Sequence, residues 1–248
     1  VNISNLKARY NVLDNKSQNI LKQLETYVGD FSKLMNNGDA SHNKDVESKT
    51  KLINFYKTSG FSIFNIISCQ FAIHYSFENE ISMRGLIHNI YNNLPIGGLF
   101  FGTCFDGKRM FDLLKKNKGH VSGDINDKNV YEVKMDPKST FKNVGTEIEF
   151  KFSSINDNFM TEYLVNFDYF IQVMKDDYDI NIITDEEAKE MDLPGGLSSF
   201  EEIYNDQNKF VLDETEKQLV FNYYYFVFKK TGTGDGKEIA KWNKMLAL

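Results

Sequence analysis

The segment between Gln70 and Glu78 gathers polar and aromatic side chains that could bind a small ligand. Gln70 lies near the end of a nearly continuous apolar run over 63–71, which is typical of a buried parallel strand, and His74, Tyr75 and Glu78 follow that run. Ligands of open α/β sheets bind just beyond the carboxyl ends of such strands. The side chains offer hydrogen bonds and stacking surface, and the sequence offers no obvious nucleophile–base triad or carboxylate pair. From this pattern alone, a core strand followed by a polar loop is an equally good interpretation.

Helices and strands alternate around this segment. Apolar residues over 83–94 follow an i, i+3, i+4, i+7 spacing, which predicts an amphipathic helix that stops at Pro95-Ile96-Gly97-Gly98. A second helix is predicted over 108–116. This alternation favours an α/β fold. Three further strands are predicted, over 99–105, 178–184 and 219–230, and the last is rich in aromatic residues.

Two stretches of strict alternation predict a small antiparallel element. Tyr131–Met135 and Glu147–Phe152 place apolar and polar residues in turn, as half-exposed strands do. We therefore expect a β insertion over about 129–155. The next apolar spacing predicts a helix that begins near Phe159 and carries Glu162 in its first turn. A carboxylate at that position can simply complement the helix dipole.

The N-terminal part of the chain carries weaker signals. Apolar residues over 1–16 have helical spacing, and a strand is predicted over 24–28. Asp30 follows Gly29 directly after that strand, and an Asp in this position is ordinary turn chemistry. Because the sequence begins with Val1 inside a helical pattern, we expect it to be a fragment of a longer protein.

Composition limits the classes of function. The chain has 248 residues and a net charge of −6, which argues against broad, nonspecific nucleic-acid binding. Recognition of one nucleotide end in a pocket is compatible with that charge. Cys69 and Cys104 lie in apolar runs without disulfide or metal spacing, so we expect reduced thiols and no bound metal. No apolar run reaches the length of a membrane span.

The run S-C-Q-F-A-I-H-Y-S-F-E over 68–78 resembles the central motif of mRNA cap guanine-N7 methyltransferases, in which Q-F-x-x-H-Y-x-F-E is characteristic. M-T-E-Y over 160–163 and the closing Y-x-x-F-x-F-x-K over 223–230 are similar to further segments of that family. Cys-Phe-Asp-Gly over 104–107 stands where cellular members tend to carry Thr-Pro-Asn. This departure looks more like the large-DNA-virus branch.

The resemblance implies a fold, a cofactor and a reaction. The fold is a Rossmann-like class I methyltransferase domain over 1–230, with a mixed, mostly parallel seven-stranded sheet. The reaction is methyl transfer from S-adenosylmethionine to N7 of the guanosine cap of mRNA. Since N7 already carries a lone pair and the sulfonium is a strong electrophile, no residue has to act as an acid or base, and positioning carries the catalysis. The residues implied at the cofactor are Asp30, Phe31 and Gln70, and those at the cap guanine are His74, Tyr75, Phe77, Glu162 and Tyr223.

The tail over 231–248 is out of order for this family. Gly232-Thr233-Gly234-Asp235-Gly236, followed by Lys241-Trp242, resembles the glycine loop that members carry near the start of the domain. The resemblance therefore implies that Gly232, Gly234 and Gly236 belong to a displaced cofactor loop, and that the first strands of the sheet are missing or displaced.

The resemblance also implies a partner and a location. The partner is the capped 5′ end of RNA, and other capping-enzyme domains or a stimulatory subunit are further candidates; no membrane is implied. The location is intracellular: the nucleus, or the cytoplasm or virion for a viral member. Two alternatives stay open. One is a catalytically inactive methyltransferase-like module that binds RNA or stimulates a partner, and the other is an active methyltransferase with a different substrate.

Overall fold

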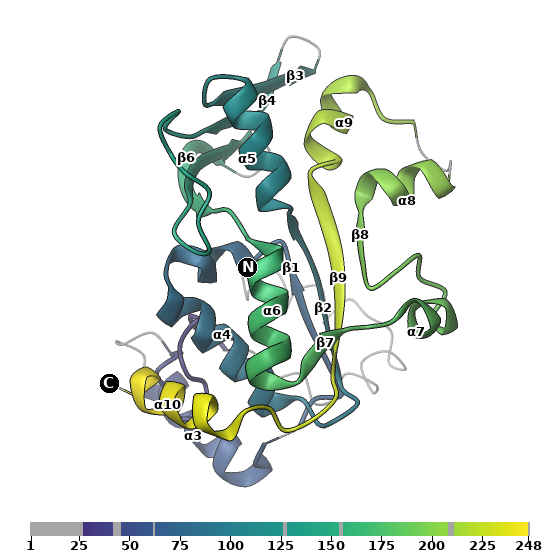
Figure 1. The fold of residues 1–248 in the computed structure, drawn as a ribbon. Helices are drawn as coiled ribbons and strands as arrows, with labels where there is room; N and C mark the ends of the chain where they lie inside the picture. The colour runs from purple at the N-terminus through teal and green to yellow at the C-terminus, as the bar shows by residue number, and fades with distance from the viewer. Residues whose placement is uncertain are drawn as a thin grey trace, which may run out of the picture.

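A mixed sheet forms the centre of the protein (Figure 1). In the computed structural model, the described residues are 27–41, 46–61, 63–125, 128–153, 156–207 and 211–247. Strands β1 (Ile66–Gln70) and β2 (Leu99–Phe105) are parallel. Strand β9 (Tyr223–Lys230) runs antiparallel to β2, to β7 (Ile180–Ile182) and to β8 (Leu197–Ser199). The α/β class with a mixed sheet is thus confirmed, while the mostly parallel, seven-stranded arrangement stays a prediction.

Helices α4 and α6 cover one face of this sheet, and their apolar residues build the main core. Met83, Ile87 and Ile90 of α4 pack with Phe170 of α6 and Phe226 of β9. Capping residues set where these helices begin, since Asn79 accepts a hydrogen bond from the backbone N–H of Ser82 at the start of α4. The helical elements are α3 (Val46–Ser59), the 3₁₀ helix η1 (Ile73–Glu78), α4 (Glu80–Asn93), α5 (Gly107–Lys116), α6 (Phe167–Tyr178), α7 (Asp185–Glu190), α8 (Phe200–Gln207), α9 (Glu214–Val220) and α10 (Gly236–Leu246).

A second, four-stranded antiparallel sheet stands beside the first. Its strands pair in the order β3 (His120–Ile125), β4 (Lys128–Lys134), β5 (Glu147–Phe152) and β6 (Asn156–Tyr163). The two alternating strands predicted from the sequence are confirmed as β4 and β5. The sheet is wider than the predicted insertion because β3 and β6 extend it on both sides.

The helix predicted from Phe159 is wrong. Residues up to Tyr163 form β6, and α6 begins only at Phe167, where Asn166 accepts a hydrogen bond from the backbone N–H of Tyr169. Short apolar runs are ambiguous between helix and strand, and here pairing with β5 decides for the strand. Glu162 therefore lies in a strand, where it has no helix dipole to complement.

Strand β1 is less buried than its apolar sequence predicted. None of Ile66–Gln70 is buried, and Ile66 is 60% exposed. Among the described strands, β1 pairs with β2 alone, so one of its edges has no described strand beside it. The predicted helix over 1–16 and most of the predicted strand over 24–28 lie outside the described residues. The closing strand is confirmed, but it starts at Tyr223 because α9 takes the residues up to Val220.

A cluster of charges on the four-stranded sheet gives a first prediction. The carboxylate of Glu132 lies 2.8 Å from Lys134, 3.2 Å from Lys151 and 3.0 Å from His120. The hydrogen bond from Lys134, with help from Lys151 and His120, lowers the pKa of Glu132 to about 2. A lowered pKa in the folded state adds stability above the ordinary pKa of the carboxyl, and this stability is lost as the pH falls through the lowered value.

Replacing Glu132 with Gln is therefore expected to lower the free energy of unfolding near neutral pH by about 1–2 kcal/mol. Thermal melts across the acid range measure the effect, and the difference from the unaltered protein should shrink below pH 4.5 toward pH 2. Glu149→Gln, at an exposed position of β5, is the matched control. An equal loss at every pH would show that packing, not charge, was removed.

Candidate functional site

His74 and Glu162 meet at the carboxyl end of β1. His74 comes from η1 and Glu162 from β6, and His74 Nε2 lies 3.5 Å from Glu162 Oε1. The exposed fractions of their side chains are 9% and 7%. Within the described part of the chain, Nε2 is buried without a hydrogen-bond partner, because the contact with Glu162 lacks hydrogen-bond geometry. The pair therefore keeps hydrogen-bonding capacity for a third group.

Aromatic rings flank this pair. The ring of Tyr75 lies 4.1 Å from the His74 ring and is half exposed. Tyr223, the first residue of β9, stacks on Phe105 with ring centres 4.0 Å apart. Burial raises the pKa of the Tyr223 phenol, and the neighbouring Cys104 and Glu162 raise it further. The phenol therefore stays protonated beside Glu162 and keeps an O–H to donate.

The structure adds Phe71, which the sequence analysis did not assign. Phe71 is 50% exposed, and its ring meets the edge of Tyr223 at a centre-to-centre distance of 5.2 Å. Its φ of 51° lies in the left-handed region, which is unusual for a bulky residue and is often found at functional sites. The sequence does place an aromatic residue directly after Gln70. Because Phe71 also ends the apolar run over 63–71, it was interpreted as part of the buried strand.

Phe77 is not at this site. Its side chain is fully buried and packs edge-on against Phe170 at 5.5 Å. Phe77 exposes no surface that a ligand could contact in this arrangement, and its assignment to the guanine stays a prediction. Its role is to anchor η1 in the core under the site.

The three residues predicted for the cofactor, Asp30, Phe31 and Gln70, lie in different surroundings. Gln70 is exposed at the end of β1, where its Oε1 accepts a hydrogen bond of 2.8 Å from Thr103 Oγ1. Phe31 lines an apolar cavity of about 270 Å³ that also contacts Cys69, the neighbour of Gln70. The Asp30 carboxylate accepts hydrogen bonds from the backbone N–H and hydroxyl of Ser32, which is the turn chemistry expected after Gly29.

The tail glycines lie at the other end of the sheet. Leu99 pairs with Lys229 and Phe105 pairs with Tyr223, so the tail leaves β9 at the amino end of β2. Gln70 and His74 lie near the carboxyl end, roughly 20 Å away at 3.3 Å per strand residue. Figure 1 shows the same separation: α10 lies at the opposite end of the molecule from α5, which follows β2.

The close approach of the Asp179 carboxylate explains why glycines occur in the tail. The backbone N–H of Gly234 donates to Asp179 Oδ2 at 2.8 Å, its φ is 69°, and a Cβ on Gly232 would collide with the same carboxylate. In this arrangement Gly232, Gly234 and Gly236 lie away from Gln70, and Trp242 docks the tail on α4 and α6. Their assignment to a cofactor loop stays a prediction.

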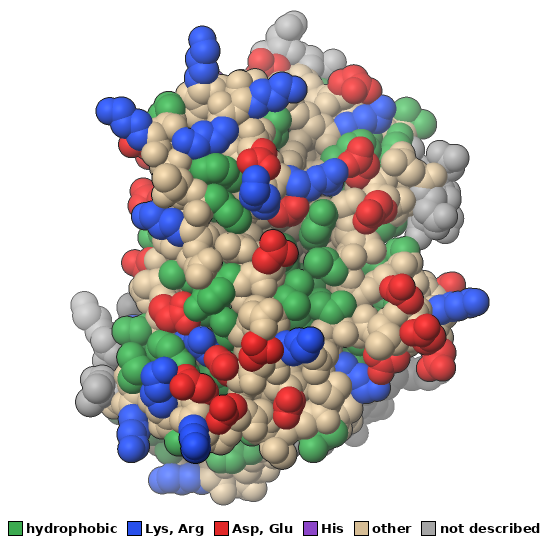
Figure 2. All heavy atoms as spheres, viewed as in Figure 1, with side chains coloured by type: hydrophobic (Ala, Val, Ile, Leu, Met, Phe, Trp, Pro, Cys, Tyr) green, Lys and Arg blue, Asp and Glu red, His purple; other side chains and the backbone are tan. Residues whose placement is uncertain are grey.

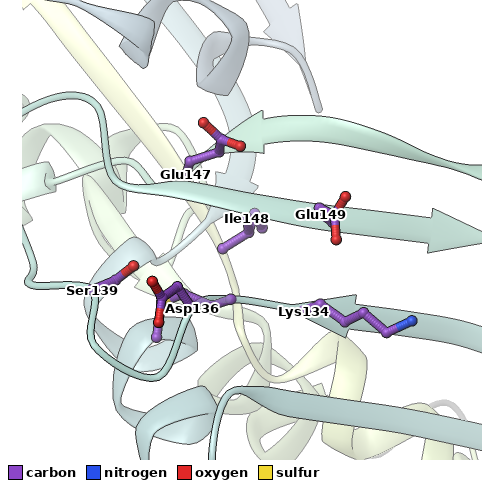
Figure 3. Close-up of a pocket in the computed structure, with 7 residues that line it drawn as sticks. Lys134, Asp136, Ser139, Glu147, Ile148 and Glu149 are labelled. Atoms are coloured by element: carbon purple, nitrogen blue, oxygen red, sulfur yellow. The ribbon is translucent and has the colours of Figure 1, made fainter.

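A polar hollow of about 460 Å³ lies on the four-stranded sheet (Figure 3). Glu147, Ile148 and Glu149 of β5 line one side of it, and Lys134, Asp136 and Ser139 line the other. Ile148 pairs with Glu162 across β5 and β6, so the hollow adjoins the strand that carries the site. None of the site residues predicted from the sequence lines it.

Surface charge is mixed on the visible face of the molecule. Figure 2 shows acidic and basic side chains interspersed, with apolar patches between them. On this face neither sign of charge dominates, so it offers no continuous basic area for a long polyanion. Among the described residues, no group of three acidic, His or Cys side chains could hold a metal, and no helix is long and apolar enough to cross a membrane.

Comparisons with known proteins agree on one family. Residues 1–231 match the family model of the mRNA (guanine-N(7))-methyltransferase domain. The mRNA cap guanine-N(7) methyltransferase 1 of Arabidopsis thaliana is 27% identical over 188 residues, covering 70% of this chain and 49% of that protein. The mRNA cap guanine-N(7) methyltransferase of Saccharomyces cerevisiae is 26% identical over 183 residues, covering 67% of this chain and 41% of that protein. The chain thus spans about half the length, or less, of these relatives.

Among solved structures, an S-adenosylmethionine-dependent methyltransferase from Clostridium acetobutylicum aligns with 75% of this chain and 72% of its own. The TM-score is 0.39 and the sequence identity 14%.

Proposed function

The chain belongs to the mRNA (guanine-N7)-methyltransferase family, and from this premise we propose that it transfers a methyl group from S-adenosylmethionine to N7 of the guanosine cap of mRNA. The observation that carries the proposal is the buried contact of 3.5 Å between His74 and Glu162, with Tyr75 and Tyr223 beside it. These side chains come from η1, β6 and β9, which are far apart in sequence.

The chemistry of guanine fits this pair. The base offers two adjacent N–H donors, at N1 and N2, which a carboxylate can accept together in a bidentate contact. The neighbouring O6 is an acceptor, so the unpartnered His74 Nε2 matches it when this nitrogen carries the proton. The rings of Tyr75 and Phe71 supply exposed aromatic surface for the purine face.

Positioning accounts for the catalysis. When bound, S-adenosylmethionine supplies an electrophilic methyl group, and the task of the protein is to hold N7 in line with it, an effect that can be worth roughly 7–11 kcal/mol. Gln70 and Phe31 fit as holders of that molecule, since Gln70 exposes an amide at the carboxyl end of β1 and Phe31 borders an apolar cavity. Glu162 and the aromatic rings suit the positive charge that develops on the purine.

The direct test incubates the chain with S-adenosylmethionine and RNA that carries an unmethylated GpppG cap. The expected product is N7-methylguanosine on the cap, detected after nuclease digestion. Uncapped RNA of the same sequence is the control. Methylation of uncapped RNA to the same extent would favour a different substrate.

An inactive module is the second candidate, favoured by the position of the tail glycines away from Gln70. Calorimetry separates the two proposals. Binding of S-adenosylmethionine supports the enzyme, whereas GpppG binding without any binding of S-adenosylmethionine supports a module that recognises capped RNA.

Phe71 gives a second prediction. Replacing Phe71 with Ala is expected to weaken GpppG binding by about tenfold, because stacking of a base on an aromatic ring is worth about 1–3 kcal/mol. The melting temperature should change little, since the side chain is half exposed. Phe61→Ala, at another half-exposed phenylalanine, is the matched control. Equal GpppG affinities for the two variants would exclude Phe71 from the binding surface.

A further inference from the structure

Cys104 touches the side of His74 that faces away from Glu162. Cys104 lies on β2, is fully buried, and its Sγ is 3.9 Å from His74 Nδ1. The other ring nitrogen, Nε2, is the one that lies 3.5 Å from Glu162. The imidazole is therefore held between a thiol and a carboxylate, with one nitrogen toward each.

A protonated thiol beside Nδ1 favours one of the two tautomers of His74. Burial raises the pKa of Cys104, and the nearby Glu162 and Cys69 raise it further, so the group stays an S–H. An S–H beside an imidazole nitrogen can donate to that nitrogen only if the nitrogen is unprotonated. In a neutral imidazole the proton then sits on the other nitrogen, since the hydrogen bond made by one nitrogen sets the state of its partner.

We infer that Cys104 is a positioning residue, which fixes His74 in the tautomer that carries its proton on Nε2. Nε2–H then lies on the Glu162 side of the ring, and it can donate to O6 of a guanine whose N1 and N2 are held by Glu162. This role rests on the proposed function, because the proton matters for binding only if a guanine edge enters the site.

Two variants separate hydrogen bonding from packing. Cys104→Ser keeps a donor of similar size, and Cys104→Val fills the volume without a donor. Cys69→Ala is the control for loss of a thiol, because Cys69 lies on the neighbouring strand. Two readouts are needed: the tautomer of His74, by NMR of isotope-labelled histidine near neutral pH, and the affinity for GpppG, by calorimetry. The chain has 4 histidines, so a His74→Gln sample assigns the signal.

The expected result is an Nε2–H tautomer and GpppG affinities within about twofold for the unaltered protein, Cys104→Ser and Cys69→Ala. Cys104→Val should lose the single tautomer and bind GpppG about tenfold more weakly, which is the upper range for one hydrogen bond.

Other outcomes overturn the inference. A His74 that is doubly protonated, or that carries its proton on Nδ1, contradicts it. An unchanged tautomer in Cys104→Val also contradicts it, whatever happens to affinity, because the thiol then acts by packing alone. If the tautomer responds as expected but no protein binds GpppG, the proposed function fails and the hydrogen-bond assignment stands.

Discussion

Replacing Glu162 with glutamine is expected to lower kcat/KM for methylation of capped RNA by about a hundredfold. The carboxylate can accept from guanine N1 and N2 together, whereas glutamine turns an N–H₂ group toward one of those donors. A charge-assisted hydrogen bond contributes about 1.5–3 kcal/mol, and 1.36 kcal/mol corresponds to a factor of ten. Initial rates at varied concentrations of capped RNA measure the effect.

Glu149→Gln is the control, since Glu149 is exposed on the neighbouring strand β5. Affinity for S-adenosylmethionine should be unchanged in both variants. Normal methylation by Glu162→Gln would mean that the guanine is held elsewhere, and the site described around His74 would have to be abandoned.

Replacing Trp242 with Ala is expected to lower the free energy of unfolding by about 3–5 kcal/mol. Trp242 is buried in α10, and the Arg84 guanidinium lies 4.7 Å from the centre of its ring. Arg84 in turn forms ion pairs with Glu80 and Asp177, so one tryptophan joins α10 to charges on α4 and α6. Urea denaturation followed by circular dichroism measures the loss.

Trp242→Phe should restore most of the stability, and Lys241→Ala, at an exposed position beside it, should change little. These variants also test the role of the tail. Loss of S-adenosylmethionine binding in Trp242→Ala with unchanged stability would support a cofactor loop, and the docking contacts would then be secondary.

Strong periodicity explains what could be predicted from the sequence. Helix α4 combines a long apolar face with a stop at Pro95 and Gly97, and both β4 and β5 alternate strictly, so local signals agreed with the fold. The contact between His74 and Glu162 was expected only from the resemblance, because no local pattern links residues 88 positions apart. Their burial and spacing follow from the packing of β6 against η1.

The failures have physical causes as well. The residues around Met160 form a short mixed run, and only pairing with β5 makes it a strand. The left-handed backbone conformation of Phe71 depends on its tertiary surroundings, and the local sequence does not predict it. The glycines of the tail indicate that another group approaches the backbone closely. A glycine does not show whether that group is a ligand or a carboxylate of the protein, such as that of Asp179.

The order of strands has a consequence for biosynthesis. Strand β9 lies between β2 and β7 in the described sheet, although it is the last of the described strands along the chain. While a ribosome is still translating the residues before Tyr223, β2 and β7 have no central strand to join them, and the apolar residues that β9 covers stay open to solvent. The hydrogen-bonding partner of His88, Asn243, lies 155 positions further along the chain and is translated later than β9. The nascent chain thus depends on late-emerging residues to close its core, and a chaperone that shields β2 until then should raise the yield of folded protein.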